Sequence, residues 1–146
     1  MFEHILLATD GSDASAHAAQ LAVDLARIHG ARLTALYVVD PYPYLGIGET
    51  NPMGFQAYMS AALDHAAQAH AKVAALCDKG GKTVQLALRM AQDVPAAEGI
   101  VAAAQEAQAD LIVVGSHGRS GLGRMLLGSV ASKVVAQSPL PVLVAR

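Results

Sequence analysis

Short apolar runs alternate along this chain with longer, alanine-rich stretches in which apolar residues recur at helical spacing. From Asp13 to His29, for example, Leu21, Leu25 and Ile28 fall at positions i, i+4 and i+7. This pattern predicts strands and helices in strict alternation. The expected strands are 4–9, 32–39, 83–89, 111–114 and 142–144, and the expected helices are 13–29, 55–79, 93–109 and 129–137.

Such alternation predicts an α/β fold, with a parallel sheet covered by helices on both faces. The runs at 4–9 and 111–114 are almost wholly apolar, which is typical of central strands. Unusual polar loops follow the same two runs, and ligands of open α/β sheets bind where the strand order reverses. We therefore expect an open five-stranded sheet of order 3-2-1-4-5, in a single domain spanning residues 1–146.

The segment after the fourth expected strand carries the strongest chemical signal. Glycines let backbone N–H groups approach phosphate oxygens, and a following helix adds partial positive charge at its N-terminus. The alternative is a solvent-exposed glycine loop with solvated arginines. The segment does not match a Walker A loop, because Arg124-Met125 follows Gly123 where Lys-Ser/Thr is required. Its relevant residues are Gly115, Gly118, Arg119, Gly121, Gly123, Arg124, Gly128 and Ser129.

The spacing Gly115-x₂-Gly118-x₉-Gly128-Ser129 resembles the G-2x-G-9x-G-(S/T) nucleotide signature of the universal stress protein family. The opening run Ile5–Ser12 and the closing Pro139-x-Pro141-Val-Leu-Val also resemble that family. The similarity extends over the whole chain. It implies a Rossmann-like, ATP-binding fold, a homodimer and a role as a stress-response regulator.

The resemblance also implies a set of nucleotide-binding residues. Asp10 would lie beside the adenine or ribose and the metal, and the backbone of Val38 would meet the adenine. Val114 and Gly115 would line the approach to ribose and phosphate. The phosphates would meet Gly118, Gly128, Ser129 and Val130, and the neighbouring Ala8, Thr9, Ser116, His117 and Arg119 complete the expected set. This chain departs from the family at Ala91-Gln92-Asp93, where many members have glycine.

Several of these residues have a plainer interpretation. The Asp10 carboxylate can hold Mg²⁺ or accept from a ribose hydroxyl, but aspartate before a helix is also a common cap. His117 can meet phosphate through its ring or only through its backbone. An aromatic and methionine-rich group near residue 50 either covers the adenine or packs on the sheet; it comprises Tyr42, Tyr44, Met53, Phe55, Tyr58 and Met59.

The last expected strand suggests how two chains would meet. An edge strand leaves unpaired backbone groups, which either a partner or flanking prolines must manage. Val142, Leu143 and Val144 are apolar enough for a two-fold interface, whereas Pro139 and Pro141 allow the alternative of a shielded edge.

Composition excludes several other classes. The 146 residues are 53% hydrophobic and carry a net charge of −2, with 4% aromatics and no tryptophan, which argues against a nucleic-acid partner. No apolar run approaches a membrane span, and Met1–His4 lacks the basic start of a secretory signal, so we expect a cytoplasmic protein. Cys77 is the single cysteine.

Charge is unevenly distributed along the chain. Residues 1–109 hold six Lys/Arg against eleven Asp/Glu, and residues 110–146 hold four Lys/Arg against one Asp/Glu. This local positive charge suits a small anion.

The sequence leaves three functions open. The first is a regulator whose ATP occupancy alters its contacts with unknown protein partners. The second is a weak ATPase or phosphotransferase, although no general base is evident beside Asp10, Arg119 and Arg124. The third is an interaction scaffold that binds no nucleotide.

Overall fold

Strands and helices alternate along the chain as its hydrophobic pattern predicts. The computed structural model describes residues 1–41, 52–117 and 126–146, without the side chains of Pro52 and Met53. Its elements are β1 (His4–Ala8), α1 (Asp13–His29), β2 (Arg32–Val39), α2 (Pro52–Asp78), β3 (Leu86–Gln92), α3 (Ala96–Glu106), β4 (Leu111–Gly115), α4 (Ser129–Gln137) and β5 (Val142–Ala145).

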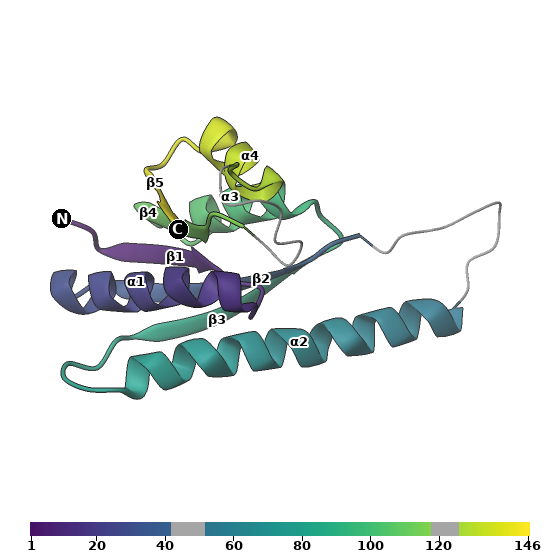
Figure 1. Cartoon of the computed structure of the whole chain (residues 1–146), viewed down its shortest axis with the longest axis horizontal. Helices are drawn as coiled ribbons and strands as arrows, with labels where there is room; N and C mark the ends of the chain where they lie inside the picture. Colours follow the sequence, from purple (N-terminus) through teal and green to yellow (C-terminus); the bar gives the residue numbers. More distant parts are fainter. Residues whose placement is uncertain (42–51, 118–125) are drawn as a thin grey trace.

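All five strands are parallel, and their order is β3-β2-β1-β4-β5, which confirms the predicted topology (Figure 1). In the register of the sheet, Ile5 of β1 lies between Leu33 of β2 and Leu111 of β4. The strand order reverses between β1 and β4, so the loops that follow these two strands meet at one edge of the sheet.

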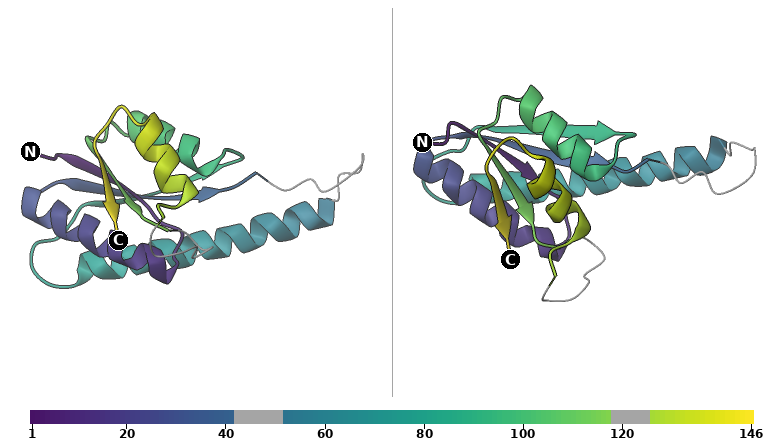
Figure 2. Two further views of the ribbon diagram at one scale, coloured as in Figure 1. Left: turned by 45° about the horizontal axis from the view of Figure 1, so that its top comes forward. Right: turned by 90° about the horizontal axis from the view of Figure 1, so that it is seen from above.

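The helices form one layer on each face of the sheet. Figures 1 and 2 show α1 and α2 on one face and α3 and α4 on the other. Side chains of β1 alternate between the two layers, as strand geometry requires. Ile5 and Leu7 pack in the α1 layer and Leu6 in the α3 and α4 layer, all with no exposed surface. The central strand is therefore fixed on both sides.

Helix α1 begins and ends at residues that the sequence predicts. The Ser12 side chain accepts a hydrogen bond from the Ser15 N–H, as an N-cap does. Gly30 ends the helix in the left-handed conformation, with φ 66° and its N–H bonded to the Ala26 carbonyl. The helix therefore starts at a defined point directly beyond β1.

Three predicted elements have boundaries that are wrong by three residues. Strand β3 spans Leu86–Gln92 rather than 83–89, because pairing with β2 begins at Leu33 opposite Leu86. Helix α2 starts at Pro52 rather than residue 55, which fits the preference of proline for a first helical turn. Helix α3 spans only Ala96–Glu106: Asp93, at φ 55°, stays outside its start, and Gln108, also at φ 55°, stays outside its end.

The start of β1 is joined to the start of β4 by a side chain. The Asp110 carboxylate accepts hydrogen bonds from the backbone N–H of Glu3 at 2.7 Å and of His4 at 3.2 Å. The buried His4 ring also forms a 2.7 Å hydrogen bond through Nε2 with the Thr34 hydroxyl of β2. Polar contacts thus hold β1, β2 and β4 together at the end of the sheet opposite the β1/β4 loops.

A buried histidine, His4, and a half-buried one, His70, should make the fold sensitive to mild acid. Burial lowers the pKa of His4, with a further contribution from the nearby Arg32 cation, and burial also lowers the pKa of His70. The unfolded chain therefore takes up protons first as the pH falls below the ordinary histidine value of about 6.5. We expect the free energy of unfolding to be constant near neutral pH and to fall by at most about 1.4 kcal/mol per pH unit per histidine. Urea unfolding between about pH 8 and pH 5 measures this slope.

The variants His4→Gln and His70→Gln should each flatten that slope, because glutamine does not titrate. An unchanged slope in both variants would show that other groups cause the acid sensitivity. His29, which contacts the Phe2 ring at the surface, provides the control substitution His29→Gln.

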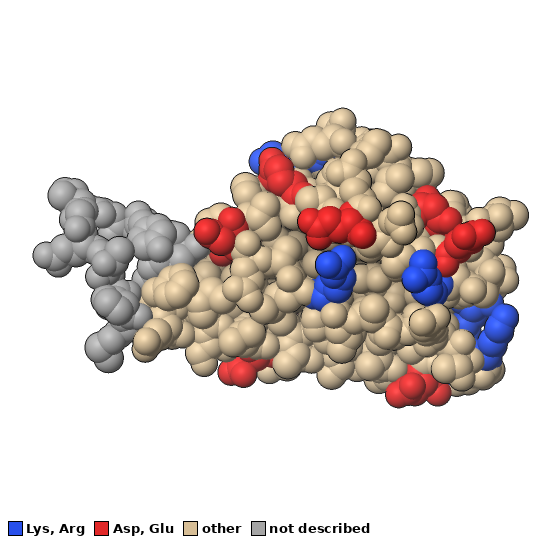
Figure 3. Space-filling view, turned by 180° about the vertical axis from the view of Figure 1, so that it is seen from behind, with Lys and Arg blue, Asp and Glu red and all other residues tan. Residues whose placement is uncertain are grey.

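Charges of both signs are interspersed on the face that Figure 3 shows, rather than gathered by sign. A face of this kind does not produce the extended positive field that attracts a long polyanion. Within the described ranges, the helices all lack the combination of length and apolar character that crossing a membrane requires.

Candidate functional site

The loop between β1 and α1 is held in one conformation by its own side chains. The Thr9 hydroxyl accepts from the Gly11 N–H at 3.2 Å, and the Asp10 carboxylate accepts from the Ser12 N–H at 2.9 Å. Thr9 and Ser15 are buried, and their hydroxyls lie 3.2 Å apart. Ser12, not Asp10, is therefore the N-cap of α1. The Asp10 carboxylate closes a turn with the Ser12 N–H, and Asp10 is half-buried.

The end of β4 and the start of α4 lie against each other. The Gly128 N–H donates to the Ser116 carbonyl at 2.7 Å, and the Ser116 N–H donates to the Ala145 carbonyl of β5 at 2.7 Å. A Cβ at Gly128 would lie only 2.8 Å from the Ser116 oxygen. Only glycine permits so close an approach of the two backbones.

The two loops at the switch point are also close to each other. A Cβ at Gly115 would lie 3.4 Å from the Ala14 carbonyl oxygen and 3.7 Å from the Ser15 Cα. The end of β4 therefore lies directly against the first turn of α1. This places the Asp10 loop and the Ser116–Gly128 contact on the same edge of the sheet.

The two helices that start at this edge differ in their first turns. The Ser12 side chain caps α1, whereas Gly128 precedes α4 and offers no side-chain cap. Ser129 and Val130, the first residues of α4, are exposed. Among the described residues no side chain caps the N-terminus of α4, so its first backbone N–H groups and partial positive charge are left for another acceptor, an arrangement that suits an anion.

Three predicted site residues have side chains that serve packing. Val114 is buried, and Ala8 and Val38 are half-buried in the cluster beneath α3 and α4. A Val38 methyl lies 3.4 Å from the Cβ position of Gly99 in α3. Any ligand contact of Val38 would thus be made by its backbone, as the resemblance implies. Gly118 and Arg119 lie outside the described residues.

His117 follows directly on the glycine-bounded contact. Its ring Nδ1 lies 3.0 Å from the Ser116 hydroxyl, and its buried Nε2 has no hydrogen-bond partner within the part of the chain that the structure describes. The surroundings of both ring nitrogens indicate that the His117 side chain lies against the protein next to the site rather than in solvent.

The candidates for a cover over the adenine divide into two groups. Tyr58 and Met59 pack against the core cluster beneath α2, and the Tyr58 hydroxyl donates to the Asp40 carbonyl at 2.7 Å. Phe55 is 43% exposed. Tyr42 and Tyr44 fall outside the described residues, and the side chain of Met53 is not described. Packing is therefore the role that the structure gives to Tyr58 and Met59.

Sequence analysis missed the contribution of α2 to this edge. An open cavity of about 340 Å³ lies between the Asp10 loop and α2. From α2 it is lined by His65, Gln68 and Lys72, and Lys72 Nζ donates to the Gly11 carbonyl at 2.6 Å. The spacing i, i+3, i+7 was a signal that these three residues share one helix face. Which element that face meets was not visible in the sequence.

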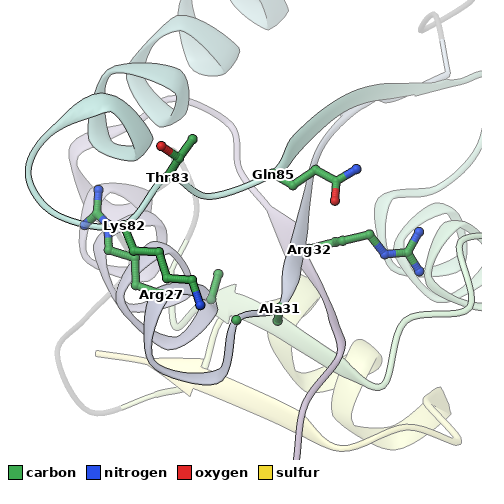
Figure 4. A pocket seen from close by; sticks show the side chains of 8 residues that line it. Arg27, Ala31, Arg32, Lys82, Thr83 and Gln85 are labelled. Atoms are coloured by element: carbon green, nitrogen blue, oxygen red, sulfur yellow. The ribbon is translucent and has the colours of Figure 1, made fainter.

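A second cavity, of about 210 Å³, lies at the opposite ends of the strands, where α1 ends and β2 begins, and is lined by several cations (Figure 4). One of these cations, Arg27, already has structural partners. Arg27 Nη2 donates to the carbonyls of Leu76, Cys77 and Lys79 at the end of α2. Lys82 Nζ lies 3.4 Å from the Cβ position of Gly30, at the end of α1. Because cations stabilise helix C-termini, Arg27 and Lys82 have a structural role at the ends of α2 and α1.

Residues that could hold a metal are few at the switch point. Among the described residues there is no group of three or more His, Cys, Asp or Glu side chains able to hold an ion. A cation at Asp10 would therefore need further oxygen ligands from a phosphate or from water, which is how Mg²⁺ is commonly bound with nucleotides.

Strand β5 forms one edge of the sheet. Val142, Leu143 and Val144 are half-buried, Leu143 toward the α1 layer and the two valines toward the α3 and α4 layer. The Ile112 N–H donates to the Pro141 carbonyl and the Ser116 N–H to the Ala145 carbonyl, so the odd-numbered residues of β5 pair with β4. The backbone groups of Val142 and Val144 consequently face away from the sheet.

The fold and the site together define a class: an open, doubly wound α/β protein with polar, glycine-containing loops at the β1/β4 switch point. The chain belongs to the universal stress protein family, whose family model matches residues 1–146. It is 42% identical over 147 residues to a universal stress protein of Thermus aquaticus, with all of both chains covered.

Solved structures agree with this assignment. The chain matches the universal stress protein UspA of Lactobacillus plantarum with a TM-score of 0.75 at 30% identity, over 99% of this chain and 97% of that one. It also matches a universal stress protein in complex with cAMP, with a TM-score of 0.64 at 26% identity, over 99% and 97% of the two chains.

Proposed function

We propose that this protein is a cytoplasmic, homodimeric regulator that binds ATP with Mg²⁺ at the β1/β4 switch point and changes its contacts with protein partners when the nucleotide is bound. The observation that carries the proposal is the close approach of Gly128 to the Ser116 carbonyl, which puts the start of α4 at the edge of the sheet that also carries the Asp10 loop. Adenine nucleotide binding by a relative, the protein solved with cAMP, supports the choice of ligand class.

The residues present fit such a ligand. Ser129 and Val130 would offer backbone N–H groups to phosphate oxygens, and Ser129 also a hydroxyl. The Gly128 N–H is bonded to Ser116, so Gly128 would contribute by letting a phosphate come close to the backbone. Asp10 would hold Mg²⁺ together with phosphate oxygens or accept from a ribose hydroxyl. The bound Mg²⁺ would neutralise phosphate charge. The chain itself would bind and orient the nucleotide, and Gly118 and Arg119 are proposed to join the phosphate contacts.

Homodimerisation through β5 belongs to the same proposal. The outward backbone groups of Val142 and Val144 are suited to pairing with a second copy across a two-fold axis, in which each residue contributes twice. The half-buried state of their side chains leaves apolar surface for the partner to cover.

A calorimetric titration of the purified protein tests the nucleotide proposal. We expect Mg-ATP to bind with a Kd of about 1–100 μM and Mg-GTP to bind far more weakly. Omitting Mg²⁺ should weaken ATP binding, because Asp10 would then face phosphate charge without a cation between them. No heat of binding at millimolar ATP would favour the nucleotide-free scaffold. Sustained turnover near about 10 per second would favour the ATPase instead.

A further inference from the structure

The loop that carries Asp10 is attached to α2 as well as to α1. Gly11 adopts φ 75°, and a Cβ at this residue would lie 3.0 Å from the Ala69 Cβ. Ala69 has no exposed surface and belongs to the cluster that packs α2 on β2. The Gly11 backbone therefore rests directly on α2, and even a methyl group would separate them.

Lys72 adds a polar bond one helical turn beyond Ala69. Its Nζ donates to the Gly11 carbonyl at 2.6 Å, so a full positive charge meets a carbonyl oxygen. Hydrogen bonds to charged groups are stronger than those between neutral groups. The residues at i and i+3 on α2 thus hold Gly11 on both its Cα and its carbonyl side.

Further hydrogen bonds hold this loop to itself, to α1 and to β2. Thr9 and Asp10 fix the N–H groups of Gly11 and Ser12, Ser12 caps α1, and the Thr9 N–H donates to the Leu36 carbonyl. Lys72 thus ties the loop to a third element, α2, by a hydrogen bond. A shift of α2 would move the Gly11 carbonyl and, with it, the adjacent Asp10.

We propose that Lys72 is a positioning residue, which holds the Asp10 loop in its nucleotide-binding conformation and couples that loop to α2. This inference rests on the proposed function. Coupling between two elements is reciprocal, so a ligand at Asp10 also stabilises the position of α2. The exposed face of α2 then carries the state of the nucleotide site to a surface that a protein partner can contact.

The test compares Lys72→Met with Lys72→Arg and with Lys79→Met. Methionine keeps the unbranched stem but removes the donor, and arginine restores a cation. Lys79, immediately after α2, provides the same charge change away from the loop. The first measurement is amide hydrogen exchange without nucleotide. We expect the Gly11 and Ser12 amides to exchange about tenfold faster in Lys72→Met than in the other two proteins.

The second measurement is Mg-ATP affinity. We expect Lys72→Met to bind about tenfold more weakly, Lys72→Arg to recover most of that loss, and Lys79→Met to match the unchanged protein. Wild-type exchange rates at Gly11 and Ser12 in Lys72→Met would overturn the positioning role. Faster exchange with unchanged affinity would overturn the link to the nucleotide. Absence of binding by the unchanged protein would refute the proposed function, while the exchange result would still decide whether Lys72 positions the loop.

Discussion

Replacing Gly128 by valine should lower the affinity for Mg-ATP by about 100-fold or more while the sheet remains folded. The backbone of Gly128, with φ −58° and ψ 155°, is open to every residue, so conformational strain is not the reason. The reason is contact: the new Cβ would lie 2.8 Å from the Ser116 oxygen and 3.4 Å from the His117 Cα. The turn must open, and the first N–H groups of α4 move away from the proposed phosphate position.

Calorimetry with Mg-ATP and urea unfolding of the same preparation separate affinity from stability. The matched control is Gly80→Val, at a glycine with φ 68° and no atom within 4 Å of its Cβ position. That variant should lose about 1–2 kcal/mol of stability through its left-handed backbone and keep its affinity for nucleotide. Full affinity in a folded Gly128→Val protein would show that phosphate does not bind at the start of α4.

Replacing Val144 by proline should convert the proposed dimer into a monomer, with a dimer dissociation constant raised by about 10- to 100-fold. The N–H of Val144 faces away from β4, so the β4–β5 ladder survives its removal. The extended backbone of Leu143 also suits a residue that precedes proline. Across a two-fold axis, each substitution removes its hydrogen bond twice.

Sedimentation over a range of protein concentrations measures this constant. Val144→Ala is the control, because alanine also shortens the side chain but retains the N–H, and it should remain dimeric. A dimer of unchanged strength in Val144→Pro would exclude the β5 edge as the interface. A wild-type protein that is monomeric at every concentration would show instead that flanking prolines shield this edge.

Most of the fold was predictable because its central strands are apolar on both faces. Runs such as Leu111–Val114 have no other plausible place than the middle of a parallel sheet. The edge strand β3 was predicted three residues too early, since the alternation begins at residue 83, before the segment that pairs with β2. Its start is set by Leu33 of β2, a partner that no local pattern reveals.

The candidate site was predictable where glycine makes the geometry necessary. The Ser116–Gly128 contact coincides with a spacing visible in the sequence, and Ser12 and Gly30 bound α1 as expected. The role of Lys72 was not predictable, because it depends on the angle at which α2 crosses the sheet. Asp10 was predictable only in part. The sequence places it at the end of β1, but its hydrogen bond with the Ser12 N–H could not be predicted from the sequence.

The position of β1 also determines the order in which the chain can fold. Its partner β2 follows after one helix, but its other partner, β4, begins 107 positions after His4 at Leu111. During synthesis, β1 can pair with β2 early, while its second edge waits until most of the chain has been made. The apolar residue Leu6 stays uncovered on the future α3 side for the same interval. The central strand β1 therefore has an unpaired edge for most of the synthesis of the chain. A chain interrupted before residue 111 keeps this aggregation-prone edge, with which β4 would have paired.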